Sequence, residues 1–156
     1  DPDRRIRLGY VSGDFRAHSA AAAFGPIILA HDPDQFEVYC YSTHNPEDSE
    51  HQRNEFRAVS NWRDLENASP GEQAQEIADD RIDILVDLSG FTAGSALQAF
   101  ALKPAPIQIS AWGYITGTAM GAMDYLFADA VTVPEPGAAV LLGIGLAALA
   151  LLRRAA

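Results

Sequence analysis

The chain has 156 residues, of which 48% are hydrophobic and 21% charged, as expected of one globular domain with its own core. Its formal net charge of −10 argues against nucleic acid, or a surface of anionic lipid, as the main partner of the domain. A single cysteine, Cys40, excludes both an intrachain disulfide framework and a zinc site built from cysteines.

Apolar runs alternate with helical patterns along the chain. Strands are predicted at Ile6–Ser12, Phe36–Ser42, 61–65, Ile82–Leu88, Ile107–Trp112 and 124–129. Helices are predicted at Ala20–Ala30, Asp48–Val59, from Pro70 with Ser69 as the N-cap, and at Ser95–Leu102. Strands separated by helices of this length predict an α/β fold, with an open, mostly parallel, Rossmann-like sheet and helices on both faces.

Ligands of open parallel sheets bind beyond the carboxyl ends of the strands. The segments there read SGDFRAHS, STHNPEDS, SGFTAGS and GYITGTAMG. Three of the four combine glycine with serine or threonine, so that bare backbone and hydroxyl groups could approach a ligand. None has the spacing of a dinucleotide fingerprint or a P-loop, and a purely steric role for these loops stays open.

Five blocks in order carry a more specific signal: RLGYVSGDFRAHS, FEVYCYS, RIDILVDLSGFTAG, FALKPAPIQISAWGY and AMDYLFAD. Over about residues 4–134 they resemble the catalytic region of the O-linked N-acetylglucosamine transferases of the SPINDLY-like family. The resemblance implies a GT-B architecture, in which two Rossmann-like halves face each other across a cleft. Residues 4–132 would form the first, acceptor-side half of such a unit.

The resemblance also implies a reaction and its partners. These enzymes transfer N-acetylglucosamine from UDP-GlcNAc to Ser or Thr hydroxyls, so the partners would be a protein acceptor and this nucleotide-sugar donor. No cofactor beyond that donor substrate and no metal ion is expected. The half that holds most of the UDP is not recognisable in the 156 residues, so we expect the chain to be inactive alone.

Carried over onto this sequence, the family's active-site histidine falls on His18 in DFRAHS. An imidazole there can take or relay the proton of an acceptor hydroxyl. Asp14 either orients that ring or only shapes the turn. Thr92 and Gly94 match the family loop near the sugar and acceptor, whereas Phe91 stands where the family has a hydrogen-bonding His or Tyr.

A further family loop corresponds to GYITGTAMGAMDY in length but not letter by letter. Within it Thr116, Gly117 and Thr118 are candidate substrate contacts, and a role in the fold alone is an equal alternative. Both tryptophans, Trp62 and Trp112, are expected to pack in the core.

The chain ends in an uncharged apolar run from Pro136 to Leu152, followed by two arginines. Residues 133–156 resemble a bacterial PEP-CTERM sorting signal, which implies insertion of Gly137–Leu152 in the inner membrane and exosortase processing at Pro134–Pro136. A helix of about 16 residues rises roughly 24 Å, slightly less than a hydrocarbon core of about 30 Å, which snorkelling arginines can make up. A buried C-terminal helix is the alternative.

Two functions therefore remain open at this stage. The first is part of a protein O-GlcNAc transferase-type glycosyltransferase. The alternative is a non-catalytic Rossmann-like domain, tethered to the inner membrane or exported through its sorting signal. Without a working signal the chain would be cytoplasmic.

Overall fold

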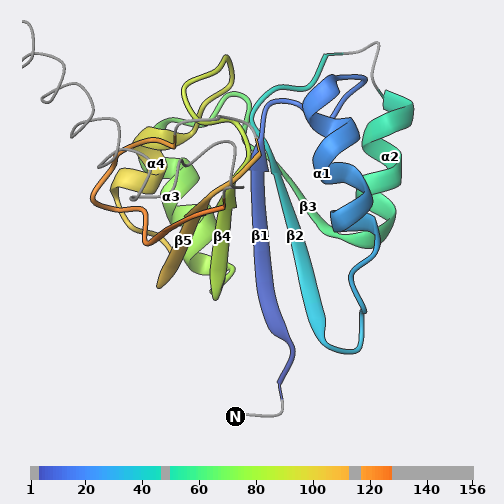
Figure 1. The fold of residues 1–156 in the computed structure, drawn as a ribbon, viewed down its shortest axis with the longest axis horizontal. Helices are drawn as coiled ribbons and strands as arrows, with labels where there is room; N and C mark the ends of the chain where they lie inside the picture. Colours follow the sequence, from blue (N-terminus) through green and yellow to red (C-terminus); the bar gives the residue numbers. More distant parts are fainter. Residues whose placement is uncertain (1–3, 47–49, 113–116, 128–156) are drawn as a thin grey trace, which may run out of the picture.

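The computed structural model describes residues 4–46, 50–112 and 117–127. They form a six-stranded sheet in the order β3-β2-β1-β4-β5-β6, in which every neighbouring pair is parallel (Figure 1). The strands are β1 (Ile6–Ser12), β2 (Phe36–Ser42), β3 (Asn61–Asp64), β4 (Ile84–Asp87), β5 (Ile107–Ser110) and β6 (Tyr125–Leu126). The helices are α1 (Ser19–Leu29), α2 (Glu50–Val59), α3 (Pro70–Asp79) and α4 (Leu97–Ala101). The predicted open parallel sheet is confirmed.

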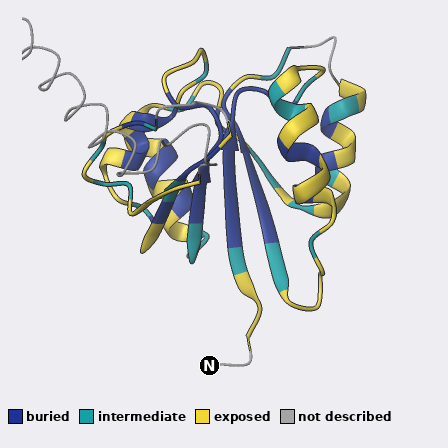
Figure 2. Cartoon of the chain, viewed as in Figure 1, coloured by how far each residue is buried: buried dark blue, intermediate teal, exposed yellow. Residues whose placement is uncertain are grey.

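One face of the sheet, here called the first face, packs against α1 and α2. Leu8 and Tyr10 of β1 point to this face and share a core with Phe24 and Ile28 of α1 and Phe56 of α2. The centres of β1 and β2 are buried (Figure 2), as expected for central strands of a parallel sheet. In Figure 1 both helices lie on the side of β2 and β3.

The opposite, second face packs against α3 and α4. Val11 of β1 and Leu85 of β4 alternate with the first-face residues and join Ile77 of α3 and Phe100 of α4 in a separate core. α3 begins as its sequence predicts. The Ser69 side chain accepts from the backbone N–H of Glu72, and the Glu72 carboxylate accepts from that of Ser69, which is a capping box.

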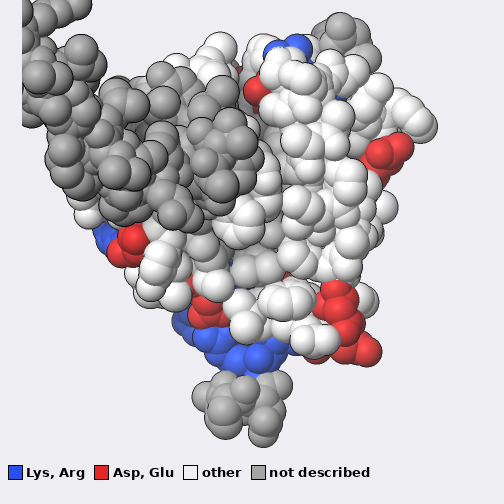
Figure 3. Space-filling view, viewed as in Figure 1, with Lys and Arg blue, Asp and Glu red and all other residues white. Residues whose placement is uncertain are grey.

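Ion pairs tie together the amino ends of the strands. Arg4 makes two bonds to the Asp83 carboxylate, at 2.6 and 2.7 Å, and the Arg7 side chain lies 3.1 Å from Glu37. The backbone N–H of Arg7 also donates to the Asp83 carboxylate, at 2.8 Å. The bonds from Arg4, which are the largest cause, and from Arg7 lower the pKa of Asp83. Figure 3 shows a cluster of basic and acidic side chains near the N-terminus, at the end of the molecule opposite the carboxyl ends of the strands.

The prediction that both tryptophans lie in the core is wrong for one of them. Trp62 packs against the first-face core, but Trp112 is 38% exposed and contacts Phe127, with ring centroids 4.9 Å apart. The backbone explains the difference, because Trp112 has a φ of +29°, which stops β5 short of the predicted strand end.

The predicted apolar helix over Gly137–Leu152 lies outside the described residues. Within the described part of the chain, none of the helices combines the length and the apolarity needed to cross a membrane.

Candidate functional site

Three loops meet at the carboxyl edge of the sheet. Gly13, after β1, touches Gly94, in the loop after β4, so closely that a Cβ on Gly94 would lie 3.1 Å from the Gly13 Cα. Thr43, after β2, donates its hydroxyl to the backbone carbonyl of Gly94. Three of the strand-end segments singled out in the sequence, those after β1, β2 and β4, therefore meet at this edge.

Buried serines hold two of these loops together from beneath. The Ser89 hydroxyl accepts the backbone N–H of Gly13 at 3.2 Å, and the Ser12 hydroxyl lies 3.4 Å from it. Ser12 also accepts the backbone N–H of Asp14 at 3.0 Å. The backbone of the loop that carries Asp14 and His18 is thus fixed by one side chain at the end of β1 and one in the turn after β4.

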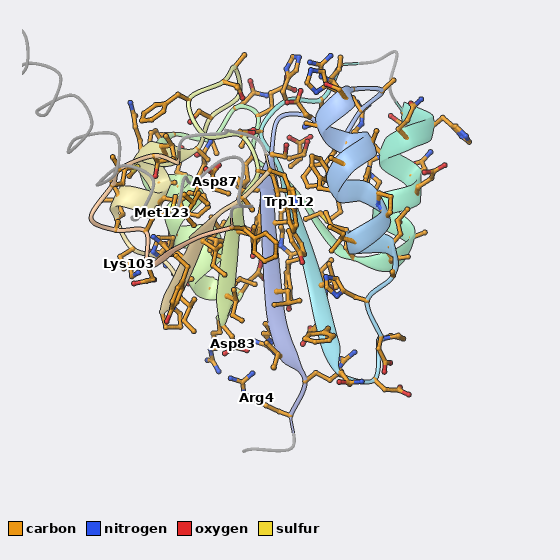
Figure 4. The ribbon with its side chains drawn as sticks, viewed as in Figure 1. Arg4, Asp83, Asp87, Lys103, Trp112 and Met123 are labelled. Carbon is orange, nitrogen blue, oxygen red and sulfur yellow. The ribbon has the colours of Figure 1, made fainter. Side chains whose placement is uncertain are left out.

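Asp87, the last residue of β4, holds the turn after this strand in place, and the sequence analysis missed it. Its side chain is fully buried and accepts the backbone N–H groups of Ser89 and Gly90 at 3.0 Å, while the Ser110 hydroxyl lies 3.4 Å away. Burial raises the pKa of Asp87, and the hydrogen bonds partly offset this. Figure 4 labels Asp87 at the end of β4. An acid that closes a buried apolar strand, in ILVDLSG, was the available sequence signal.

His18 is the N-cap of α1, and its ring is partly exposed. Nδ1 accepts the backbone N–H of Ala20 at 3.2 Å, and it lies 3.6 Å from Oδ2 of Asp14. Asp14 is largely buried and pairs with Arg16 at 2.9 Å. When Nδ1 accepts the N–H of Ala20, a neutral ring carries its proton on Nε2. In the other neutral tautomer the proton sits on Nδ1, which can donate to Asp14, and Nε2 can then accept a proton.

A hollow of about 330 Å³ opens beside His18, between α1 and α2. Small residues of α1 leave room for the hollow, namely Ala21, Ala22 and Gly25. Its polar lining includes Gln52 and Glu55 of α2. The imidazole therefore borders an open space wide enough for part of a substrate.

Thr92 and Gly94 lie in the convergent loop as predicted, although Thr92 has a partner already. Its hydroxyl donates to the carbonyl of Ser89 at 2.7 Å. Gly94 has a φ of +78°, which favours glycine. The Phe91 side chain is 60% exposed and lines a hollow with Pro70 and Gln98, on the side of α3 and α4.

The third candidate loop is only partly described. Thr116 lies outside the described residues. Gly117 has a φ of +67° and packs on Leu126. Thr118 is 6% exposed, and its hydroxyl has no hydrogen-bond partner among the described residues. Thr118 borders a hollow of about 290 Å³ together with Ser110. That Thr118 contacts a substrate stays a prediction.

Comparisons with known proteins give the fold a family context. Residues 1–140 match the profile of Glycosyl transferase family 41. A UDP-N-acetylglucosamine--peptide N-acetylglucosaminyltransferase of Caenorhabditis elegans is 36% identical over 132 residues, which is 84% of this chain and 12% of that protein. The SPINDLY protein of Arabidopsis thaliana, a probable enzyme of the same name, is 32% identical over 86% of this chain and 15% of its own length.

A solved structure supports the same relationship. A mutant of the Thermobaculum terrenum O-GlcNAc transferase superposes with a TM-score of 0.75 at 44% identity, covering 81% of this chain and 24% of that one. This chain therefore spans less than a quarter of the length of these relatives. Residues 132–154 match a second profile, the PEP-CTERM protein-sorting motif.

Proposed function

The chain belongs to glycosyl transferase family 41, and we propose that its residues 4–132 form the acceptor-side half of a protein O-GlcNAc transferase. The donor would be UDP-GlcNAc and the acceptor a Ser or Thr hydroxyl of a protein. The observation that carries this proposal is the convergence of the loops after β1, β2 and β4 beside His18, in a sequence 44% identical to a solved O-GlcNAc transferase.

In this proposal His18 receives or relays the proton of the acceptor hydroxyl. A base at Nε2 needs the proton on Nδ1, and Asp14 is the carboxylate that faces this nitrogen. The step requires the ring to give up the helix-capping bond to Ala20, because Nδ1 cannot accept that N–H and carry a proton in the same plane. Asp14 would then act as a positioning residue for the reactive tautomer.

The loop after β4 would shape the acceptor and sugar side of the cleft. Gly94 lets the backbone run against Gly13, and Thr92 fixes the turn through its bond to Ser89. Thr116, Gly117 and Thr118 are proposed as further substrate contacts from the loop that precedes β6. The Thr118 hydroxyl is buried and has no partner within the described part of the chain, so we propose that it bonds a group that enters its hollow.

A chimaera with a solved relative tests this function, because the relative supplies the remainder of the catalytic region. Residues 4–132 replace the corresponding segment of the Thermobaculum terrenum enzyme, in its unmutated form, and transfer from labelled UDP-GlcNAc to a peptide is measured. We expect transfer well above that of a chimaera carrying His18→Asn. A folded chimaera that binds UDP-GlcNAc but transfers no sugar would count against the proposed catalytic half.

The sorting motif supports a proposal about location. Residues 132–154 match the PEP-CTERM profile, and in that system the apolar span enters the inner membrane of a bacterium and an exosortase acts at the VPEP box. We place the processing position at Pro134–Pro136 and the membrane span at Gly137–Leu152. The Rossmann-like half would then be delivered to, or through, that membrane.

A further inference from the structure

Helices cover only half of the first face of the sheet. α1 and α2 pack over the side of β1 to β3, while α3 and α4 lie on the second face. Tyr125 of β6 pairs in register with Ile109 of β5, so both side chains point to the first face. Ile107 lies two residues before Ile109 on β5 and shares that direction. Phe127 directly follows β6 and continues its pairing, since its backbone N–H donates to the carbonyl of Ser110 at 2.8 Å. Among the helices of the described ranges, none packs over this part of the sheet.

The side chains on this part of the face are apolar and exposed. Ile107 is 37% exposed, Tyr125 63% and Phe127 60%, and Trp112, which contacts Phe127, is 38% exposed. These four residues are called here the β5–β6 apolar strip. Parallel strands are ordinarily covered on both faces, and an exposed apolar patch of this kind marks a surface that another element contacts.

We infer that the β5–β6 apolar strip is the docking surface for residues 137–152 of the same chain while that segment is in water. The segment has no charge and no polar face, so in water it needs an apolar surface as much as the strip does. A helix of 16 residues would be about 24 Å long. The six residues of the strip's longer side, from Ile107 to Trp112, would span roughly 20 Å if extended, so the two lengths match.

The connection between strip and segment is long enough for this contact. Phe127 belongs to the strip, and Gly137 is ten residues further along the chain. Ten residues reach at most about 33 Å, more than the distance across three strands at about 4.8 Å each.

Tethering also favours this segment over a second copy of the chain. A segment held by a short linker has an effective concentration on the order of millimolar, far above the concentration of a second copy in a dilute solution. When residues 137–152 enter a membrane, the strip is uncovered. The sorting motif would then control when this surface is exposed.

A thiol placed in the strip tests the inference in the full chain. Cys40 is fully buried, and burial raises its pKa to about 12, so a maleimide reacts only with an introduced cysteine. The reporter is Ile107→Cys, in the strip, and the matched control is Val59→Cys, an exposed apolar position on α2. Labelling rates are compared in the full chain and in a chain ending at Pro134, at low micromolar concentration.

Removing residues 135–156 should raise the labelling rate of Ile107→Cys about tenfold, as for a segment docked about nine tenths of the time, and leave Val59→Cys unchanged. A full-length variant with Leu142→Glu and Leu149→Glu should label as fast as the shortened chain. Equal Ile107→Cys rates with and without the segment would overturn the inference. Protection that disappears on dilution, with a dimer seen by sedimentation, would assign the strip to a second copy instead.

Discussion

Gly13 and Gly94 touch through their backbones where the loops after β1 and β4 meet. A Cβ on Gly13 would lie 3.2 Å from the Cα of Gly94, and one on Gly94 would lie 3.1 Å from that of Gly13. Both distances are to backbone, which cannot move as a flexible side chain does. This pair therefore sets how closely the loop that carries His18 approaches the loop that carries Thr92.

Replacing Gly94 by alanine should destabilise the fold and separate the two loops. The residue has a φ of +78°, and the added methyl would meet the Gly13 backbone. Strain of this kind costs about 1–3 kcal/mol. Urea denaturation measures the loss. Gly71→Ala is the matched control, because a Cβ there meets nothing within 4 Å and the helix gains up to about 1 kcal/mol. Equal effects at both positions would contradict the contact.

Asp87 predicts an unusual pH dependence of stability. Burial raises its pKa in the folded chain above the ordinary value of 3.8, so folding opposes its ionisation. The stability that this group contributes is therefore full below pH 3.8 and is lost as pH rises through the raised pKa. Relative to Asp87→Asn, the wild-type chain should lose stability over that interval, by at most about 1.4 kcal/mol per pH unit.

Asp83 provides the comparison of opposite sign. Its bonds to Arg4 and Arg7 lower its pKa, so its contribution is present above the ordinary value of 3.8 and is lost as pH falls through the lowered pKa. Relative to Asp83→Asn, the wild-type chain should gain stability with rising pH over that range. Urea titrations of the three proteins at several pH values measure both slopes. Slopes of the same sign would contradict the two environments.

Much of this fold could be predicted from local sequence. β1 and β2 have the predicted bounds because each is a long apolar run ended by polar residues. α3 begins at Pro70 because its cap is local. Trp112 could not be placed in this way. Its exposure depends on its positive φ and on the first face of β5, which none of the described helices covers.

The site was less predictable, because its contacts join residues far apart in the chain. His18, Thr92 and Gly94 were proposed from family motifs, yet the sequence did not show that the Thr92 hydroxyl would donate to the carbonyl of Ser89. Asp87 was missed for a related reason. Its partners come from the β4–α4 turn and from β5, and only the register of β4 with β5 brings Ser110 beside it.

Substitutions at His18 should separate its capping role from its proposed catalytic role. Asparagine keeps an acceptor for the Ala20 N–H, so His18→Asn should leave the stability of the chimaera nearly unchanged. It cannot serve as a base, and transfer should fall about 100-fold or more. His18→Ala should reduce transfer similarly and also lower stability by about 1 kcal/mol. Transfer at the wild-type rate by His18→Asn would leave His18 as a helix cap only.

Turnover by the 156-residue chain alone is not expected. The chain spans 24% of the solved relative. The family resemblance implies that a second Rossmann-like half holds most of the nucleotide. Incubation with labelled UDP-GlcNAc and peptide acceptors, with the chimaera as positive control, measures the rate. Turnover that disappears in His18→Asn would show that the 156-residue chain is sufficient for transfer.

The last prediction concerns the tail in the presence of lipid. If Gly137–Leu152 enters a bilayer, the full chain should sediment with membranes and resist carbonate extraction, whereas a chain ending at Pro134 should not. Leu146→Lys places one charge near the centre of the span, where insertion costs about 2.5–3.5 kcal/mol more, and should shift the protein toward the supernatant. An alanine at the same position keeps the span apolar and should leave the distribution unchanged. A wild-type chain that stays in the supernatant with membranes present would show that the segment prefers a protein surface to lipid.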